Sequence, residues 1–450
     1  MSRRISRRIS NKPPGPRMPR ALQAVGWTQR PLPWLERCHR RYGDIFTLRI
    51  RHYGDWVLLA DPDDVKKVFT AGRAVGVETA NPLLGPLLGP RSVMLLEEPE
   101  HMTRRKLMLP SFHGQAVQAD AEMMAQVARQ EIARWPAGEP FALWPRMQDI
   151  TLDVVMRAVF GPDSDTPRLQ PLRERLRNLT IWMNEPRNLA MLAAFGPGWV
   201  IRSRGYRESM GAVEEAVMAE VRRRKAEPDG GALGVVSMLV RAEYEDGSLL
   251  SDRDLRDELV TLLSDGPTSS TLAWTFERLL RNPDKLEKLR EDVLHGDGSY
   301  LDAVVKETLR LRPPVPVVVR SLLEPMTLGG YDLPAGTTVA PCIHLIHRDQ
   351  RWYEQPHRFL PERFVGKQPG TYTWIPFGGG VRRCLAASYA EMEMKRVLRI
   401  VFTTTELRPV ENDAERARKS AIAFAPDQKG LVIAEPRETE AAGDKALAPV

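Results

Sequence analysis

Cys384 lies in the segment FGGGVRRCLA, residues 377–386, directly before a run with helical periodicity. A thiolate is stabilised by nearby cations, by the N-terminus of a helix and by backbone N–H donors. This segment offers all three, because Arg382 and Arg383 precede the cysteine, a helical run follows it, and Gly378–Gly380 leave the backbone free to turn its amides toward sulfur. The pattern therefore predicts a thiolate that serves as a nucleophile or as a metal ligand.

These two uses make different demands on the rest of the chain. A nucleophilic cysteine normally needs a base beside it, and no histidine lies within 25 residues of Cys384. Axial ligation of haem iron has no such need, and electron donation from the thiolate there favours cleavage of an O–O bond. A structural cysteine, buried at a helix start beside a glycine turn, remains as a third interpretation.

The segment resembles the haem-binding signature of the cytochrome P450 family, Phe-x-x-Gly-x-Arg-x-Cys-x-Gly. The resemblance implies haem b as cofactor, with Cys384 as the ligand of its iron and with Phe377 and Gly380 beside the porphyrin. One position departs from the signature, since Ala386 stands where the family has glycine. We expect the added methyl group to shift the haem or its potential slightly without preventing binding.

A second group of residues supports the resemblance. Glu307 and Arg310 lie three apart, and so share a helix face, and Arg363 lies 21 residues before Cys384. In the P450 family these positions form a buried ionic network beneath the cysteine loop. A planar guanidinium can hold a carboxylate through two hydrogen bonds, and buried charges need one another. We therefore expect a structural role for these three residues; an ordinary surface pair is the alternative for Glu307 and Arg310.

Haem carries two propionates, which require cationic partners. His101 and Arg105 stand at i and i+4 in HMTRRK, hence on one helix face. The resemblance assigns this pair to the propionates, together with Arg382 and Arg320. The alternative interpretation of residues 101–106 is a basic helix facing solvent.

The segment TLLSDGPTSSTLAW, residues 261–274, departs from the family more seriously. P450 enzymes have an acid followed by threonine here, which relay protons to the oxygen, and this chain is about two residues short. Two residues correspond to about 200° of helix rotation, so the shortening must be absorbed at Gly266-Pro267, where proline interrupts the helix. Thr268 is the first candidate for the hydroxyl, Ser269 the second, and Asp265 either supplies the acid or stabilises the kink. A degraded relay is the alternative, and it predicts electrons lost to peroxide.

The elements that must position these residues are mainly helical. Alternating apolar residues predict two short strands near the N-terminus and a small antiparallel sheet after Pro314, while the rest carries helical periodicity. The fold class is therefore mainly α with small antiparallel β-sheets, as the P450 resemblance also implies. We expect strands at 47–51 and 57–59, helices at 100–109, 115–135, 149–159, 252–280 with a break, 302–312 and 384–402, and an irregular lid at 165–210.

The composition indicates one large globular domain. The chain has 450 residues, of which 42% are hydrophobic and 27% charged, and no apolar run approaches the roughly 18–20 residues of a transmembrane helix. Residues 1–12 form a basic tail, 13–435 the P450 domain and 436–450 a second tail; an anionic membrane surface is the alternative partner of the basic tail. Three scattered cysteines give neither a disulfide framework nor a zinc site. This cysteine pattern fits a reducing cytoplasm, where we expect the protein to be located. We also expect a monomer.

The expected activity is insertion of one atom of O2 into an apolar, lipid-like or terpenoid-like substrate. Its pocket walls are expected from residues 75–98, 165–210 and the turn after Ala421, and no charged anchor for an acid stands out. No dinucleotide fingerprint is present, so a separate ferredoxin or flavodoxin with its reductase should supply electrons at a basic face of Arg104, Lys106, Arg382, Arg383 and Lys395.

Three other functions stay open. The first is a P450 that uses peroxide, or that acts as an isomerase or dehydratase, and the second is a non-catalytic haem-binding protein. Nucleic-acid binding through the N-terminal arginines is the weakest, because no reading element accompanies them, and we expect none.

Overall fold

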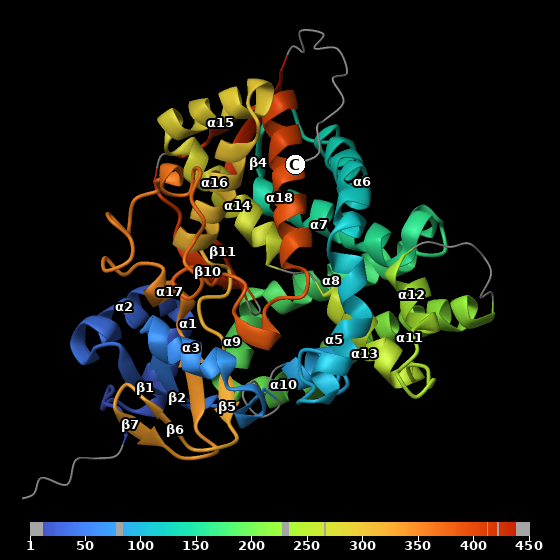
Figure 1. Cartoon of the computed structure of the whole chain (residues 1–450). Coiled ribbons are helices and arrows are strands. Elements are labelled where there is room, and N and C mark those ends of the chain that lie inside the picture. Colours follow the sequence, from blue (N-terminus) through green and yellow to red (C-terminus); the bar gives the residue numbers. More distant parts are fainter. Residues whose placement is uncertain are drawn as a thin grey trace, which may run out of the picture.

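The described part of the chain is mainly helical, as predicted (Figure 1). The computed structural model describes residues 12–77, 84–226, 234–264, 267–411, 413–420 and 423–437. Figure 1 shows the helices filling most of the molecule and the strands β1, β2, β6 and β7 grouped at one end. Within those ranges, no helix combines the length and apolarity that crossing a membrane requires.

One hydrophobic cluster joins the central helices. Apolar side chains on α18 (Ala387–Thr404) recur at Met394, Val397, Leu398 and Val401, all of them buried, which is the spacing of one helix face. This face enters a cluster that also includes residues of the helices on either side of α18 in Figure 1. Those helices are α6 (Gln115–Ile132), α7 (Leu143–Phe160), α14 (Thr268–Leu280) and α16 (Ser299–Leu311).

The largest sheet joins distant parts of the chain and contains one parallel pair that the sequence did not indicate. Its order is β1-β2-β8-β5-β3. The hairpin of β1 (Ile45–Ile50) and β2 (Gly54–Leu59) lies beside β8 (Thr338–Pro341), and β2 and β8 run parallel. The other two strands, β5 (Arg320–Leu322) and β3 (Val75–Gly76), are antiparallel to their neighbours.

Three small antiparallel sheets complete the strands. They are formed by β6 (Met326–Leu328) with β7 (Tyr331–Leu333), by β10 (Ala417–Ser420) with β11 (Ala423–Pro426), and by β4 (Pro140–Ala142), β12 (Leu431–Pro436) and β9 (Thr405–Pro409).

The expectation of an irregular lid at 165–210 is wrong. The segment forms α8 (Gln170–Asn184), α9 (Pro186–Phe195), α10 (Pro197–Arg202) and the start of α11 (Arg204–Ala226). Three of its prolines, Pro171, Pro186 and Pro197, occupy the first or second positions of α8, α9 and α10, where proline fits a helix because the first N–H groups have no partner. These prolines therefore begin helices.

The long segment 252–280 is interrupted as expected. It forms α13 (Asp252–Leu263) and α14, and Pro267 is the N-cap of α14. Ser251 and Asp254 form the capping box at the start of α13. Asp265 and Gly266 lie outside the described residues.

The remaining helices are shorter or more peripheral, and none changes the architecture. They are α1 (Arg20–Gln29), α2 (Pro31–Tyr42), α3 (Pro62–Thr70), α4 (Leu84–Leu88), α5 (Glu100–Met108), α12 (Val235–Arg241), α15 (Pro283–His295) and α17 (Ile343–Ile346). The two expected tails lie almost wholly outside the described residues, and the domain limits stay predictions. Pro436, assigned to the second tail, ends β12 and pairs with Thr405.

Candidate active site

The cysteine loop leaves Cys384 accessible at the start of α18. Cys384 is exposed, whereas Cys38 and Cys342 are buried. The backbone N–H of Cys384 donates to the carbonyl oxygen of Phe377 at 2.9 Å, which closes the loop, and Ala386 is the N-cap of α18. An exposed thiol at this place does not fit the interpretation of a buried structural cysteine.

Glycine is required in this loop by a close approach to α3. Gly380 has φ +65°, and a Cβ there would lie 1.9 Å from the carbonyl oxygen of Phe69. A Cβ on Gly379 would lie 2.3 Å from the ring of the same phenylalanine. The glycines therefore let the loop pack directly on the last turn of α3, and this contact fixes the position of Cys384.

The surroundings of Cys384 act on its pKa in opposite directions. Although the side chain is accessible, protein on most sides removes much of its water, and this burial raises the pKa of the thiol. The backbone N–H of Ala386 and the cations of Arg383 and Arg105 lower it. The predicted stabilisation of a thiolate is present but does not outweigh burial, and a bound metal cation would reverse the balance because a coordinating thiol is deprotonated.

The four predicted cationic residues lie close enough to repel one another. Burial lowers the pKa of His101, with further lowering by Arg382 and Arg105. Burial also lowers the pKa of Arg320 to about 10, again with a contribution from Arg382. His101 is 3% exposed, so the alternative of a basic helix face in solvent is wrong for this residue.

Carboxylates compensate only part of this positive charge. Glu98 accepts a hydrogen bond from Nδ1 of His101 at 2.7 Å, and Glu97 pairs with Arg382 at 3.1 Å. Within the described ranges, Arg105 and Arg320 have no hydrogen-bonded carboxylate; Arg320 donates only to a backbone carbonyl oxygen. An accessible thiol beside partly buried, undercompensated cations fits a metal porphyrin with two carboxylates.

The ionic network beneath the loop is present. Arg310 donates to both carboxylate oxygens of Glu307, at 2.7 and 2.8 Å, and both side chains are 0% exposed. Arg363 lies 3.1 Å from the same carboxylate, and the backbone N–H of Leu360 donates to it at 2.8 Å. The alternative of a surface pair is wrong, and the carboxylate joins α16 to the chain that leads toward Cys384.

The candidates for oxygen activation lie at the helix interruption. Thr268 is the first residue of α14, is partly buried, and its hydroxyl has no hydrogen bond within the described ranges. Ser269 is 1% exposed, which makes Thr268 the more accessible hydroxyl. Asp265 lies outside the described residues, and all three assignments stay predictions.

The sequence model of the cytochrome P450 family matches residues 12–432. This chain belongs to the cytochrome P450 family. The family comprises haem-thiolate oxidoreductases that bind haem through its iron. The exposed Cys384 and the ionic network thus lie in a chain that matches the family over nearly its whole length.

Known relatives and solved structures agree with this assignment. The chain is 41% identical to cytochrome P450 135B1 of Mycobacterium tuberculosis over 92% of this chain and 89% of the relative, and 37% identical to P450 137 of the same species over the same shares. The structure of a retinoic acid-bound cyanobacterial CYP120A1 superposes with a TM-score of 0.81 at 21% identity, covering 95% of this chain and 99% of the other. The last comparison shows the P450 fold.

The structure of this P450 corrects the expected basic face for a redox partner. Arg104 is 0% exposed and cannot contact a partner. Arg382 and Lys395 are partly buried and paired with carboxylates. Lys106 and Arg383 are exposed, so only these two of the five stay candidates.

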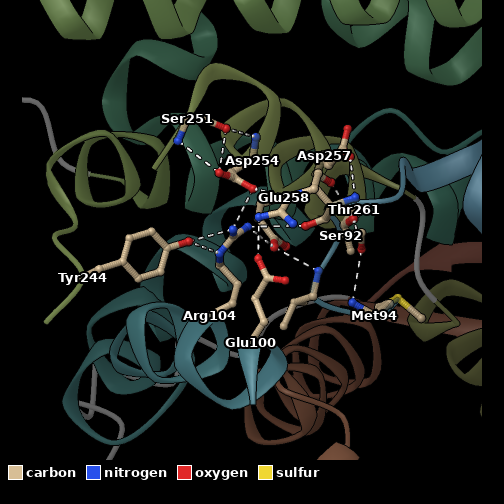
Figure 2. Close-up of polar contacts among 12 residues, drawn as sticks. Ser92, Met94, Glu100, Arg104, Tyr244, Ser251, Asp254, Asp257, Glu258 and Thr261 are labelled. Atoms are coloured by element: carbon tan, nitrogen blue, oxygen red, sulfur yellow. Dashed lines mark hydrogen bonds and ion pairs between the residues drawn. The ribbon is translucent and has the colours of Figure 1, made fainter. Parts of the chain in front are cut away.

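Arg104 instead belongs to a buried network between α5 and α13 that the sequence did not indicate (Figure 2). Its guanidinium pairs with Glu258 and Asp254, each at 2.8 Å, and donates to the Tyr244 hydroxyl at 2.8 Å. The only available signal was the spacing of Asp254, Asp257 and Glu258, which places three acids on one helix face. Arg104, the shared partner of Asp254 and Glu258, lies about 150 residues earlier, and the sequence does not show that pairing.

The same acids hold the backbone of the loop before α5 (Figure 2). Asp257 accepts from the N–H of Arg91 at 2.8 Å, and Glu258 accepts from the N–H of Val93 at 2.9 Å. A Cβ at Gly89 would lie 2.1 Å from the Asp257 carboxylate, so the loop approaches the helix closely. The network therefore fixes part of segment 75–98, one of the expected pocket walls.

Proposed function

We propose that this P450 is a monooxygenase that inserts one atom of O2 into an apolar, lipid-like or terpenoid-like substrate, with Cys384 as the ligand of haem b iron. The observation that carries the proposal is the exposed thiol beside Arg105 and Arg320, which have no carboxylate partner among the described residues, because two haem propionates would supply the missing negative charge. Cysteine usage, with two buried free thiols, supports a cytoplasmic location.

Each predicted residue has a defined task in this proposal. His101, Arg105, Arg320 and Arg382 bind the propionates, whose charges relieve the repulsion among these cations. Phe377, Gly380 and Ala386 form the proximal wall next to the porphyrin. Bound haem supplies the binding and reductive activation of O2.

Protons reach the oxygen side through the start of α14. Thr268 donates through its hydroxyl, which has no partner among the described residues, with Ser269 as the second candidate and Asp265 as the acid that replenishes the proton. Removing the Thr268 hydroxyl should lower the product formed per NADPH consumed and raise peroxide release. The matched variants are Thr268→Ala and Thr268→Ser, of which the second keeps the hydroxyl.

The ligand assignment is tested by spectroscopy on purified protein. The reduced carbonyl complex should show a thiolate-type Soret band, and Cys384→Ser should abolish this band. Cys38→Ala is the control, because this buried cysteine lies in another part of the fold. A pigment without a thiolate-type band in the unaltered protein would refute the assignment.

A second candidate is favoured by the interruption between α13 and α14. A P450 whose proton relay is impaired can use peroxide directly, or act as an isomerase or dehydratase without external electrons. Turnover with peroxide and no reductase, combined with poor coupling to NADPH, would favour this candidate. A protein with the spectrum but no turnover under either condition would be a non-catalytic haem-binding protein.

A further inference from the structure

Lys419 lies in β10 as a cation without an anionic partner. Its Nζ lies 5.7 Å from the ring centroid of Trp27 and 5.6 Å from that of Tyr53. No carboxylate pairs with it among the residues that the structure describes. Cation–π contacts stabilise an ammonium group, but they leave its hydrogen-bond donors free.

The neighbouring groups are also unpaired donors. The Tyr53 hydroxyl makes no hydrogen bond within the described ranges, and the indole N–H of Trp27 is buried without a partner. Buried polar groups in proteins are normally paired. The ammonium of Lys419 and the indole N–H of Trp27 can only donate, and the Tyr53 hydroxyl can donate as well as accept. Such a group of donors is suited to a ligand that only accepts, and an ionised carboxylate is such a ligand.

Lys419 stays charged at neutral pH even though it is enclosed. Its side chain is partly accessible, and burial lowers its pKa to about 8. Removing a charged group from water without a counter-ion costs free energy. An anion bound here would recover this cost, which is the physical reason to expect a ligand.

The hairpin that carries Lys419 connects this position to the proposed reaction site. Lys419 pairs in register with Phe424 of β11, whose carbonyl oxygen accepts from the indole of Trp274 in α14 at 3.0 Å. On the other side, the Ser420 hydroxyl donates to Asn184 of α8 at 2.5 Å. The hairpin therefore contacts both α14, which begins at Thr268, and α8.

We propose that Lys419 and the Tyr53 hydroxyl bind the carboxylate of the substrate, which makes the substrate class an apolar carboxylic acid. The acid group is held at the hairpin, and the apolar chain extends toward the cysteine loop. This inference rests on the proposed function for its catalytic meaning, and it differs from the expectation that no charged anchor for an acid stands out.

Binding of dodecanoic acid and of its methyl ester to the holoprotein tests the site. Calorimetry and the optical shift of the haem should both show the acid binding about tenfold or more tightly than the ester, since hydrogen bonds to charged groups are the strong ones. Lys419→Met should remove this preference and leave the affinity for the ester nearly unchanged. Lys419→Arg should retain it.

Lys66→Met is the matched control, because Lys66 also lies over one aromatic ring, Tyr372, but is exposed. Preference for the acid in the unaltered protein should fall as pH rises above about 8, where Lys419 loses its proton. Equal affinity of the unaltered protein for acid and ester, or an acid preference that survives Lys419→Met, would overturn the proposal. Lys419-dependent binding by calorimetry without a thiolate-type Soret band would instead refute the proposed function alone.

Discussion

At the scale of single residues, the buried carboxylate of Glu307 holds several parts of the chain together. One carboxylate accepts from two guanidinium groups and one backbone amide while being 0% exposed. Arg310 also donates to the carbonyl oxygens of His347 and Pro356, at 2.6 and 2.8 Å. Both partners are needed, because removing one leaves a buried charge without compensation.

Glu307→Gln should therefore lower the free energy of unfolding by about 3–5 kcal/mol, and haem incorporation should fall with it. Urea unfolding and the ratio of Soret to protein absorbance measure the two effects. Glu208→Gln is the matched control, because Glu208 pairs with Arg204 on an exposed helix face and should change stability by less than about 1 kcal/mol. Equal effects of the two variants would contradict a structural role for Glu307.

Glycine is favoured in the cysteine loop for two reasons, a positive φ and a close approach to α3, and a comparison of Gly380 with Gly378 distinguishes them. Both have positive φ, +65° and +70°, but a Cβ on Gly378 would meet nothing within 4 Å. Gly378→Ala should cost about 1–2 kcal/mol from backbone strain alone. Gly380→Ala should cost more and reduce haem content, because Phe69 of α3 must move. Thermal unfolding and haem titration measure the two effects. A Gly378→Ala variant that is as unstable as Gly380→Ala would contradict this difference between the two glycines.

At the scale of elements, the contact between α13 and the loop before α5 contains a buried carboxylic acid. One oxygen of Glu258 accepts from Arg104 and the N–H of Val93, while the other is buried without a partner. Burial raises the pKa of Glu258 to about 7, although Arg104 lowers it. Asp254 also faces Arg104, and its negative charge raises the pKa of Glu258 further.

The raised pKa makes stability depend on pH. Between about pH 4.5 and 7 the folded protein holds a proton on Glu258 that the unfolded chain releases, so the free energy of unfolding decreases as pH rises through this window. The decrease from this residue should amount to about 3 kcal/mol. Glu258→Gln resembles the protonated form and should flatten the curve.

Urea unfolding of both proteins at several pH values measures the difference. Burial also raises the pKa of Glu415 to about 7. Because Glu415 titrates in both proteins, the difference between their curves gives the contribution of Glu258 alone. Glu245→Gln is the control, because Glu245 is exposed. Parallel curves for the unaltered protein and Glu258→Gln would show that the carboxylate is ionised throughout this range.

At the scale of the whole molecule, a net charge of +7 favours an acidic redox partner. Lys106 and Arg383 are exposed on α5 and the cysteine loop, whereas Arg104, two residues before Lys106, is buried. Long-range attraction between exposed charges is screened within about 8 Å at physiological salt. The rate of reduction should therefore decrease as salt increases.

Lys106→Glu should slow reduction by an acidic ferredoxin at low salt and weaken the dependence on salt, as stopped-flow absorbance would record. Arg51→Glu makes the same change of charge at an exposed position of the β1–β2 turn, and it should have the smaller effect. A reduction rate that is indifferent to salt and to Lys106→Glu would exclude docking on this face.

The sequence was sufficient where function depends on local spacing. The cysteine loop, the Glu307–Arg310 pair, the capping box of Ser251 and the break before α14 all consist of residues near one another in the chain, whose types restrict the backbone or share a helix face. Likewise, the apolar periodicity of α18 follows from its own residues. The proline-led helices of segment 165–210 were not predicted, because proline both ends and begins helices.

Tertiary structure decided the pairings between distant residues. The sequence shows Arg104 as one member of a basic run, yet packing of α5 against α13 buries it beside Glu258. The sequence likewise shows no reason to single out Lys419, and only the approach of β10 to Trp27 and Tyr53 leaves its charge enclosed and unpaired. The physical reason is that desolvation and charge pairing depend on which surfaces meet, and local spacing does not contain that information.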